Sequence, residues 1–217
     1  PTDRRRIYYR DLPREVADEL WRRFSDALRP LHDAGKLGLV LFQFPNWVTP
    51  GERSREHILL CKAHLPGYRL AVEFRNEAWF SPSERDATLA FLRQHGLTHV
   101  VADEPQVKGE SVPLVPEVTT DVAYIRFHGR NKETWSGPKE ASWERFNYWY
   151  SPEDMDELTP VVRALAERSS TIYALFNNNY RDQGVQGAML LARKLGIQLP
   201  LPQMDALPLP EDAAPSG

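Results

Sequence analysis

The sequence has a single cysteine, Cys61, among 217 residues, and this excludes a disulfide framework and a zinc site built from cysteines. No apolar run approaches the roughly 18 residues that a membrane-spanning helix needs. There is no excess of one charge, since 27 Lys and Arg face 30 Asp and Glu and leave a formal net charge of −3. That balance gives no overall attraction to nucleic acid or to an anionic membrane. What remains is a soluble globular domain of a reducing compartment, which predicts a cytoplasmic protein.

The glycine-rich signatures of nucleotide binding are also missing, because no Gly-x-Gly-x-x-Gly or phosphate-loop motif follows a predicted strand. The chain begins at Pro1 with neither Met nor a targeting pattern, so we expect part of the N-terminus to be missing. Residues 199–217 are rich in proline and in small and acidic residues, which predicts a disordered tail. The remainder, residues 1–198, is predicted to be a single domain.

Two hydrophobic periods alternate along this domain. Helical spacing predicts helices over residues 13–34, 83–95, 152–168 and 185–195, and Ser151 is a suitable N-cap for the third of these. Short apolar runs predict five strands, at residues 37–42, 69–74, 99–102, 122–127 and 171–176. Strands that alternate with helices indicate an α/β fold with a mostly parallel sheet.

Every predicted strand is followed by polar side chains, and ligands of parallel α/β folds bind at the carboxyl ends of the strands. Because strand ends also return to solvent, any one of these residues is weak support for a site, whereas the whole set favours one. The set comprises Gln43, Glu73, Arg75, Asp103, Arg126, His128, Arg130, Asn177, Asn178 and Asn179.

Glu73 and Arg75 are two positions apart and therefore share one face of their strand. One interpretation is a buried ion pair that fixes the sheet. The other makes Glu73 a base or a metal ligand and Arg75 a clamp for an anion. The sequence leaves these two alternatives open.

Arg126, His128 and Arg130 repeat this spacing, with Gly129 allowing close approach of the backbone. Two arginines beside a histidine suit a phosphate or carboxylate ligand and favour the neutral imidazole. A structural network around His128 is the alternative. Asp103 likewise has two interpretations, as a capping residue or as a ligand contact. The run of three asparagines that begins at Asn177 is longer than a turn requires.

A long segment rich in aromatic residues lies between Gly129 and Pro152. It is too long for an ordinary connection in an α/β unit, so it predicts a lid or a wall of a ligand cleft. The alternative is a separate hydrophobic cluster that holds this segment down. Its aromatic residues are Trp135, Trp143, Tyr148, Trp149 and Tyr150.

Four ordered motifs resemble the YecE-like family, also known as DUF72 (domain-of-unknown-function family 72), over about residues 13–197. The motifs are residues 39–45 (LVLFQFP), 72–75 (VEFR) with Trp79 and Phe80, 126–130 (RFHGR) and 176–179 (FNNN). The resemblance implies a TIM-like barrel of roughly eight βα units, of which this chain lacks about the first three strands. It implies no reaction, because the activity of the family is not established.

These patterns favour an enzyme that acts on a small anionic, phosphorylated or sugar-like substrate by hydrolysis or isomerisation. Glu73, Asp103 and His128 are the candidate catalytic residues and, in a metal-assisted variant, the candidate ligands of a divalent metal. A non-catalytic protein that binds or senses a small ligand is the alternative. The candidate substrate-binding residues are Gln43, Arg75, Arg126, Arg130, Asn177 and Asn178.

Overall fold

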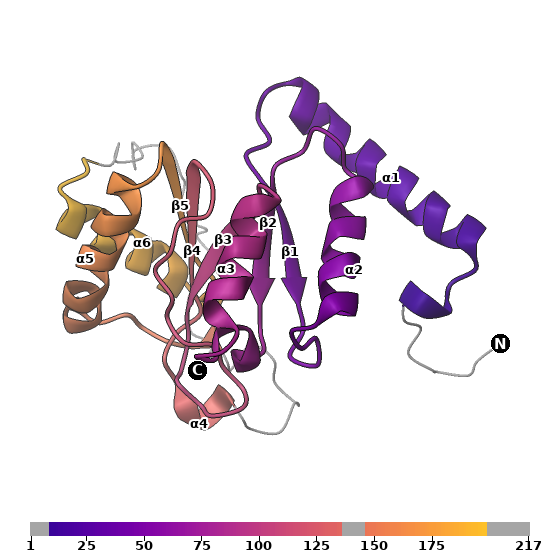
Figure 1. Cartoon of the computed structure of the whole chain (residues 1–217). Helices are drawn as coiled ribbons and strands as arrows, with labels where there is room; N and C mark the ends of the chain where they lie inside the picture. The colour runs from indigo at the N-terminus through magenta and orange to yellow at the C-terminus, as the bar shows by residue number, and fades with distance from the viewer. Residues whose placement is uncertain (1–8, 136–145, 199–217) are drawn as a thin grey trace, which may run out of the picture.

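The computed structural model describes residues 9–135 and 146–198. Its centre is one sheet of five parallel strands, paired in the order β1-β2-β3-β4-β5 (Figure 1). The α/β fold and the parallel sheet are therefore confirmed. The predicted tail, residues 199–217, lies outside the described residues, and so does Trp143. The strands are β1 (Val40–Phe44), β2 (Leu70–Phe74), β3 (Thr98–Asp103), β4 (Val122–Phe127) and β5 (Thr171–Phe176).

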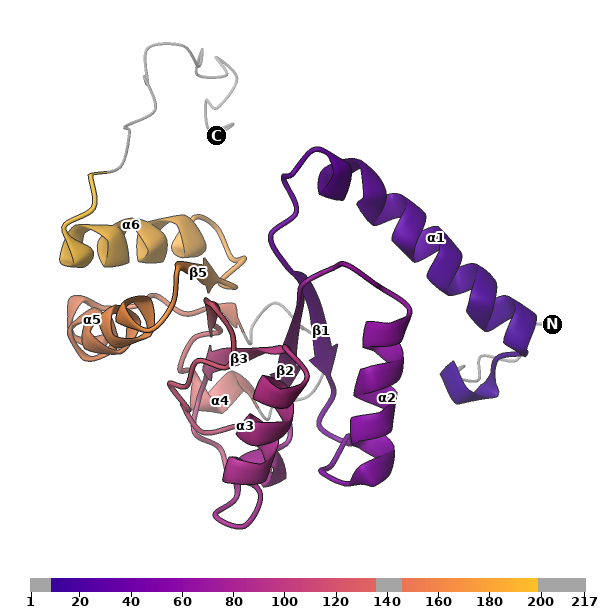
Figure 2. The same ribbon diagram turned by 45° about the horizontal axis from the view of Figure 1, so that its top comes forward.

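The longer helices lie along the outer side of this sheet (Figure 2). A sheet whose strands follow one another in sequence order, with right-handed connections, places every crossover helix on the same face. None of the helices in the described part of the chain combines the length and the apolar character needed to cross a bilayer. The helices are α1 (Arg14–Asp33), α2 (Glu52–Ala63), α3 (Arg85–Gln94), α4 (Lys132–Trp135), α5 (Pro152–Glu167) and α6 (Gln183–Leu195), with short 3₁₀ helices η1 (Tyr9–Asp11) and η2 (Glu77–Phe80).

The hydrophobic core lies mainly between the helices and the outer face of the sheet. One cluster joins β1 and β2 to α1, α2 and α3, and a second joins β3, β4 and β5 to α5 and α6. The inner face carries a smaller cluster of Ala71, Val100 and Tyr124. The sheet curves so strongly that a Cβ added at Gly38, before β1, would collide with the hydroxyl of Tyr173 on β5. The inner face is therefore concave, and the outer face holds most of the apolar packing.

Most predicted elements match the observed ones within two residues, and the first strand is the exception. Pairing begins at Val40 opposite Leu70 and runs to Phe44, whereas the apolar run that predicted the strand begins at Leu37. An apolar run does not show which residues pair with the next strand, so the predicted start of β1 was misplaced. The Ser151 cap is confirmed, because its hydroxyl accepts from the backbone N–H of Asp154 in a capping box.

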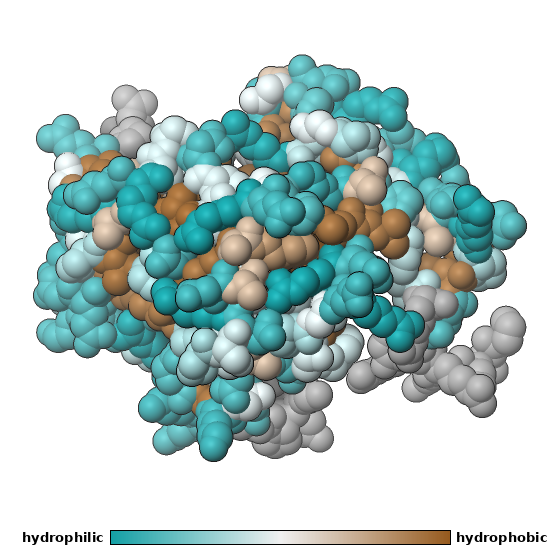
Figure 3. All heavy atoms as spheres, viewed as in Figure 1, coloured by the Kyte–Doolittle hydropathy of each residue, from teal (hydrophilic) through white to brown (hydrophobic). Residues whose placement is uncertain are grey.

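Within the described residues, β1 and β5 each keep one unpaired edge, so the sheet is open rather than closed. Apolar side chains also reach the surface in patches (Figure 3). On α1, Val16, Leu20 and Phe24 recur every four residues on an exposed face. Unpaired strand edges and exposed apolar faces both promote association.

We therefore expect the 217-residue chain to associate as its concentration rises. Sedimentation velocity over a dilution series measures this directly. Replacing Leu20 and Phe24 together by Glu should shift the distribution toward monomer, whereas Arg23→Gln, a change at an exposed polar position of the same helix, should not. A monodisperse monomer at every concentration would contradict the prediction.

Candidate functional site

The candidate site lies on the concave face, at the carboxyl ends of the strands. Alternation along each strand and the register between strands place there the side chains that share a face with Ala71, Val100 and Tyr124. Hydrogen bonds and ion pairs then join these side chains across the sheet. They are Gln43 on β1, Glu73 and Arg75 at β2, Glu104 after β3, Arg126 and His128 at β4, and Asn177 after β5.

Glu73 is the centre of this network, and its side chain has no exposed surface. Its Oε1 lies 2.7 Å from Arg75 Nε and 3.3 Å from His128 Nε2, and its Oε2 accepts a hydrogen bond from Arg126 Nη1. Burial alone would raise the pKa of Glu73, but the hydrogen bond from His128 and the charges of Arg75 and Arg126 outweigh it and hold the pKa at about 2. Glu73 is therefore an ionised carboxylate that holds both arginines in place.

Glu104 is a second buried carboxylate beside the same arginine. It accepts hydrogen bonds from Arg75 Nη1 and from the backbone N–H of Val112, the latter at 2.6 Å. Burial raises the pKa of Glu104 to about 7 and outweighs the opposing charge of Arg75. Glu104 is thus the carboxyl of this network that exchanges a proton near neutral pH.

His128 is fully buried, and burial lowers its pKa to about 4 against the opposing effect of Glu73. Its Nδ1 lies 3.2 Å from Asn177 Nδ2. An amide nitrogen can only donate, so Nδ1 is the acceptor and the proton of the neutral ring is on Nε2, facing Glu73. His128 is therefore a neutral donor held between an amide and a carboxylate.

The groups that reach solvent in this site are hydrogen-bond donors and an amide. The side chains of Arg75 and Arg126 are each 13% exposed, and both contact the exposed Gln43, whose Oε1 lies 3.3 and 3.2 Å from their Nη atoms. The guanidinium of Arg75 also lies 5.8 Å from the ring centre of Trp135. The arrangement presents two pre-positioned guanidinium groups to a ligand and keeps the carboxylates behind them.

Asp103 and Arg130 were predicted for this site, and the structure places them elsewhere. Asp103 pairs in register with Phe127 on the outer face, where it contacts Arg130 at 2.9 Å and accepts from the Tyr150 hydroxyl at 2.6 Å. Arg130 also lies 3.2 Å from Asp154. Burial raises the pKa of Asp103 despite its hydrogen bonds from Arg130 and Tyr150. Both residues therefore lie apart from the arginine network, because Asp103 alternates to the opposite side from Glu104 and contacts Arg130 there.

The predicted metal ligands Glu73, Asp103 and His128 are consequently not brought together. Glu73 and His128 face each other on the concave side, while Asp103 is bound to Arg130 behind the sheet. In residues 9–135 and 146–198, no three His, Cys, Asp or Glu side chains form a group able to hold a metal ion. The described residues therefore do not fit the metal-assisted variant.

Of the asparagine run, Asn177 alone contacts the network. The Asn178 amide donates to the backbone oxygen of Phe146 at 3.2 Å, and its Oδ1 is buried without a hydrogen bond. Its side chain also lies beside Gly129. Asn178 therefore contacts the segment after Gly129 and lies apart from the arginine network.

The aromatic residues after Gly129 divide between two places. Tyr148 and Tyr150 pack with the outer cluster around Phe127, which agrees with the alternative of a cluster that holds this segment down. Trp135 is buried and lies near Arg75. The aromatic pattern predicted a single role, whereas the described residues serve two.

Tyr150 supports the turn that carries His128. Its hydroxyl donates to Asp103 and accepts from the backbone N–H of Gly129 at 2.9 Å, and Gly129 has a φ of 92°. Tyr150→Phe leaves both partners buried without this bond, so we expect a loss of about 1–3 kcal/mol in the free energy of unfolding. Urea denaturation measures this loss.

The same variant should shift the imidazole resonances of His128 in NMR spectra, which a remote structural defect would not do. Tyr148→Phe is the matched control, because its hydroxyl bonds Asp154 at 2.9 Å, and Asp154 keeps its bonds from the backbone of Ser151. Equal losses in the two variants, with unchanged His128 signals, would argue against this role of Tyr150.

The amino-acid sequence is similar to that of a known protein family. The family model described as "Protein of unknown function DUF72" matches residues 2–212. UPF0759 protein YunF of Bacillus subtilis (strain 168) is 34% identical over 192 residues, which are 87% of this chain and 68% of that protein.

Solved structures of DUF72 family proteins have the same fold. One from Thermotoga maritima MSB8 is 35% identical, with a TM-score of 0.74 over 82% of this chain and 65% of that one. Another, from Enterococcus faecalis V583, is 25% identical, with a TM-score of 0.80 over 84% of this chain and 67% of that one. Sequence and fold thus agree, and the chain belongs to the DUF72 family.

Proposed function

We propose that the five strands are an arc of a TIM-like (β/α) barrel and that the chain is part of an acid–base enzyme. The sequential strand order, the one-sided helices and the concave inner face support the barrel. The relatives extend beyond the matched part, which leaves room for further strands. In such barrels the carboxyl ends of the strands form the active site.

The substrate we propose is a small molecule that carries a phosphate or carboxylate, such as a sugar phosphate. The exposed edges of Arg75 and Arg126 would bind the anionic group, and Gln43 and Asn177 would bind hydroxyl or carbonyl oxygens. Glu73 and Glu104 fix the two arginines from behind, so little side-chain entropy is lost on binding. The donors are arranged for a ligand rich in oxygen atoms.

The observation that carries the proposal is the placement of two fully buried carboxyls, those of Glu73 and Glu104, against one guanidinium, that of Arg75. Burial raises the pKa of Glu104 to about 7, whereas His128 and the arginines hold that of Glu73 at about 2. A pair of acids with separated pKa values is typical of acid–base catalysis. An anion bound to Arg75 shares that guanidinium with Glu104, which would then exchange a proton with the ligand, as isomerisation or hydrolysis requires.

A non-catalytic binding protein is the second candidate. It is favoured by the ion pairs of the network, because both buried carboxyls already contact arginine. Such a protein would bind the same anions without chemistry. The two candidates share a ligand and differ in whether covalent bonds of that ligand are broken, a C–H bond in isomerisation or an ester bond in hydrolysis.

Solvent deuterium exchange separates the two candidates. Sugar phosphates are incubated with the full chain in D₂O and followed by NMR, beside calorimetric binding of the same compounds. An enzyme incorporates deuterium or converts the substrate, and Glu104→Gln should reduce that rate about 10²–10⁴-fold. Glu110→Gln, at an exposed position of the same connection, is the control. Binding without exchange would support the second candidate, and neither binding nor exchange would contradict both.

A further inference from the structure

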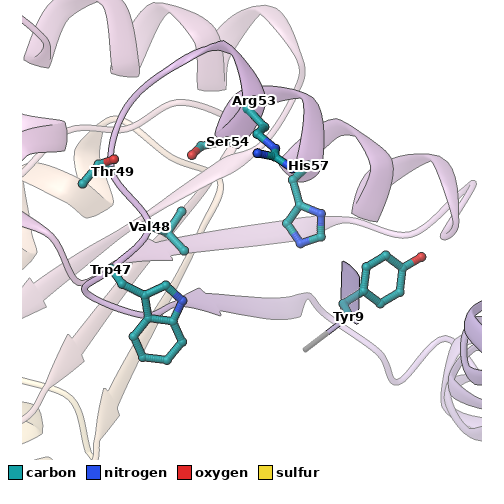
Figure 4. Close-up of a pocket in the computed structure, with 7 residues that line it drawn as sticks. All are labelled: Tyr9, Trp47, Val48, Thr49, Arg53, Ser54 and His57. Carbon is teal, nitrogen blue, oxygen red and sulfur yellow. The ribbon is translucent and has the colours of Figure 1, made fainter. Parts of the chain in front are cut away.

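A second cavity lies away from the arginine network, between η1 and the first turns of α2 (Figure 4). Its volume of about 520 Å³ is in the range of small-ligand pockets. Aromatic, hydroxyl and basic side chains line it, and no acidic side chain is among the described lining residues. The lining residues are Tyr9, Trp47, Val48, Thr49, Arg53, Ser54 and His57.

Trp47 is the most unusual of these residues, because its side chain is 65% exposed. It belongs to the connection between β1 and α2, which is anchored on both sides of it. The backbone oxygen of Asn46 accepts from Asn76, and that of Val48 accepts from Trp79 Nε1 at 2.8 Å. The anchored backbone thus holds the indole ring of Trp47 in solvent. A flat ring of a ligand that stacked on this indole would bury apolar surface, which is favourable.

Arg53 supplies an uncompensated positive charge at the same cavity. In the described part of the chain it makes no ion pair or side-chain hydrogen bond, whereas Arg55, two residues later, contacts Glu84 at 3.0 Å and lies over the ring of Trp79. Thr49 and Ser54, which carry hydroxyl groups, line the same cavity and lie to the left of Arg53 in Figure 4. A free guanidinium beside hydroxyl groups is suited to one anionic group of a ligand.

The part of the lining formed by His57 and Tyr9 is aromatic and held in place by its neighbours. The ring of His57 lies 5.7 Å from that of Tyr9 and 6.2 Å from that of Phe44, and the Tyr9 hydroxyl accepts from Trp21 Nε1 at 2.8 Å. Burial lowers the pKa of His57, so this wall is uncharged at neutral pH. Arg53 is therefore the one charged side chain among the described residues of the lining.

We infer that this cavity binds a small ligand in which a flat ring is joined to one anionic group, with the ring on Trp47 and the anion on Arg53. A mononucleotide has this chemistry, and stacking with a single cation requires no glycine-rich motif. The inference does not rest on the proposed function, because none of the lining residues belongs to the arginine network.

Titration of the full chain with AMP tests the inference, with adenosine and inorganic phosphate as the ring-only and anion-only arms. We expect AMP to bind and each part alone to bind at least about fivefold more weakly. Trp47→Ala should weaken AMP binding by at least about fivefold, as expected for loss of one stacked base. Arg53→Gln should reduce it to the affinity for adenosine.

Two controls locate the binding. Trp149→Ala removes another exposed indole, 52% exposed, and should leave AMP binding unchanged. Arg126→Gln removes an anion-binding group of the arginine network, and the AMP binding that depends on Trp47 should remain. The inference is overturned if AMP fails to bind at millimolar concentration, if Trp47→Ala leaves AMP binding unchanged, or if Arg126→Gln abolishes binding while Trp47→Ala does not. Because Trp47 and Arg53 are exposed, both variants should fold, which circular dichroism verifies.

Discussion

Replacement of Glu73 by Gln is expected to lower the free energy of unfolding by about 3–5 kcal/mol, the usual loss when one partner of a buried ion pair is removed. Glu73 is the carboxylate that contacts Arg75, Arg126 and His128 together. With Gln at this position, Arg75 keeps Glu104 as a carboxylate partner, whereas the mostly buried Arg126 keeps none among the described residues. Urea denaturation at pH 7 measures the loss.

Glu157→Gln is the matched control, because Glu157 also contacts an arginine, Arg130, but its side chain is 69% exposed. Exposed ion pairs contribute about 0–1 kcal/mol, so the control should change little. The same Glu73 variant should lose anion binding, since its arginines are no longer held in place. If Glu73→Gln were as stable as the control, the network would be a surface feature and not the centre of the site.

The concave network was partly visible in the sequence because alternation along a strand is a local property. The spacing of Glu73 and Arg75 predicted a shared face, and so did that of Arg126 and His128, and the contacts confirm both pairs. The sequence left open whether Glu73 and Arg75 form a structural pair or a ligand clamp. The structure shows that they are paired, and the partial exposure of Arg75 keeps its clamp role as a proposal.

Asp103 was predicted for the site and Glu104 was not. The cause is the uniform burial of β3. All six residues from Thr98 to Asp103 are buried, so hydrophobicity does not reveal which of them face inward. The face is fixed only by pairing of Ala102 with Arg126 on the next strand, which makes Glu104 an inward position. Adjacent strand residues point to opposite sides, so an error of one position exchanged the two carboxyls.

The cavity beside Trp47 had no sequence signal of the same kind. Its walls come from η1, the β1–α2 connection and α2, and their proximity depends on how α1 and α2 pack against the sheet. An exposed tryptophan cannot be told from a buried one by composition. Sites built by strand alternation are therefore more predictable from one sequence than sites built by helix packing.

Acidification from pH 6.5 to pH 4 is expected to destabilise the protein through two buried histidines, His99 and His128. Burial lowers the pKa of both to about 4. An imidazole in the unfolded chain titrates near 6.5, so between these values the unfolded chain binds protons that the folded chain excludes. The stabilisation is complete above pH 6.5 and is lost as the pH falls, by about 3 kcal/mol for each histidine at pH 4.

Glu104 acts in the opposite direction over part of this range. Its pKa of about 7 lies above that of an unfolded glutamate, so the folded chain keeps a proton that the unfolded chain loses as the pH rises from about 4.5 to 7. Asp103, whose pKa burial also raises, has the same sign. The pH dependence of the free energy of unfolding is therefore the histidine contribution minus the opposing contribution of Glu104 and Asp103. Testing the effect of one histidine requires a variant in which only that histidine is replaced.

His99 can be isolated because it lies outside the arginine network, with Nε2 at 3.0 Å from the backbone oxygen of Val115. His99→Gln keeps a donor for that oxygen and removes the titration. Between about pH 4.5 and 6, the free energy of unfolding of the variant should depend on pH less steeply than that of the unchanged protein, by about 1.4 kcal/mol per pH unit. A constant cost of the substitution cannot produce this difference, because it shifts the curve without changing its slope. His32→Gln, at an exposed imidazole, is the control, and parallel curves for His99→Gln and the unchanged protein would show that His99 is not the group responsible.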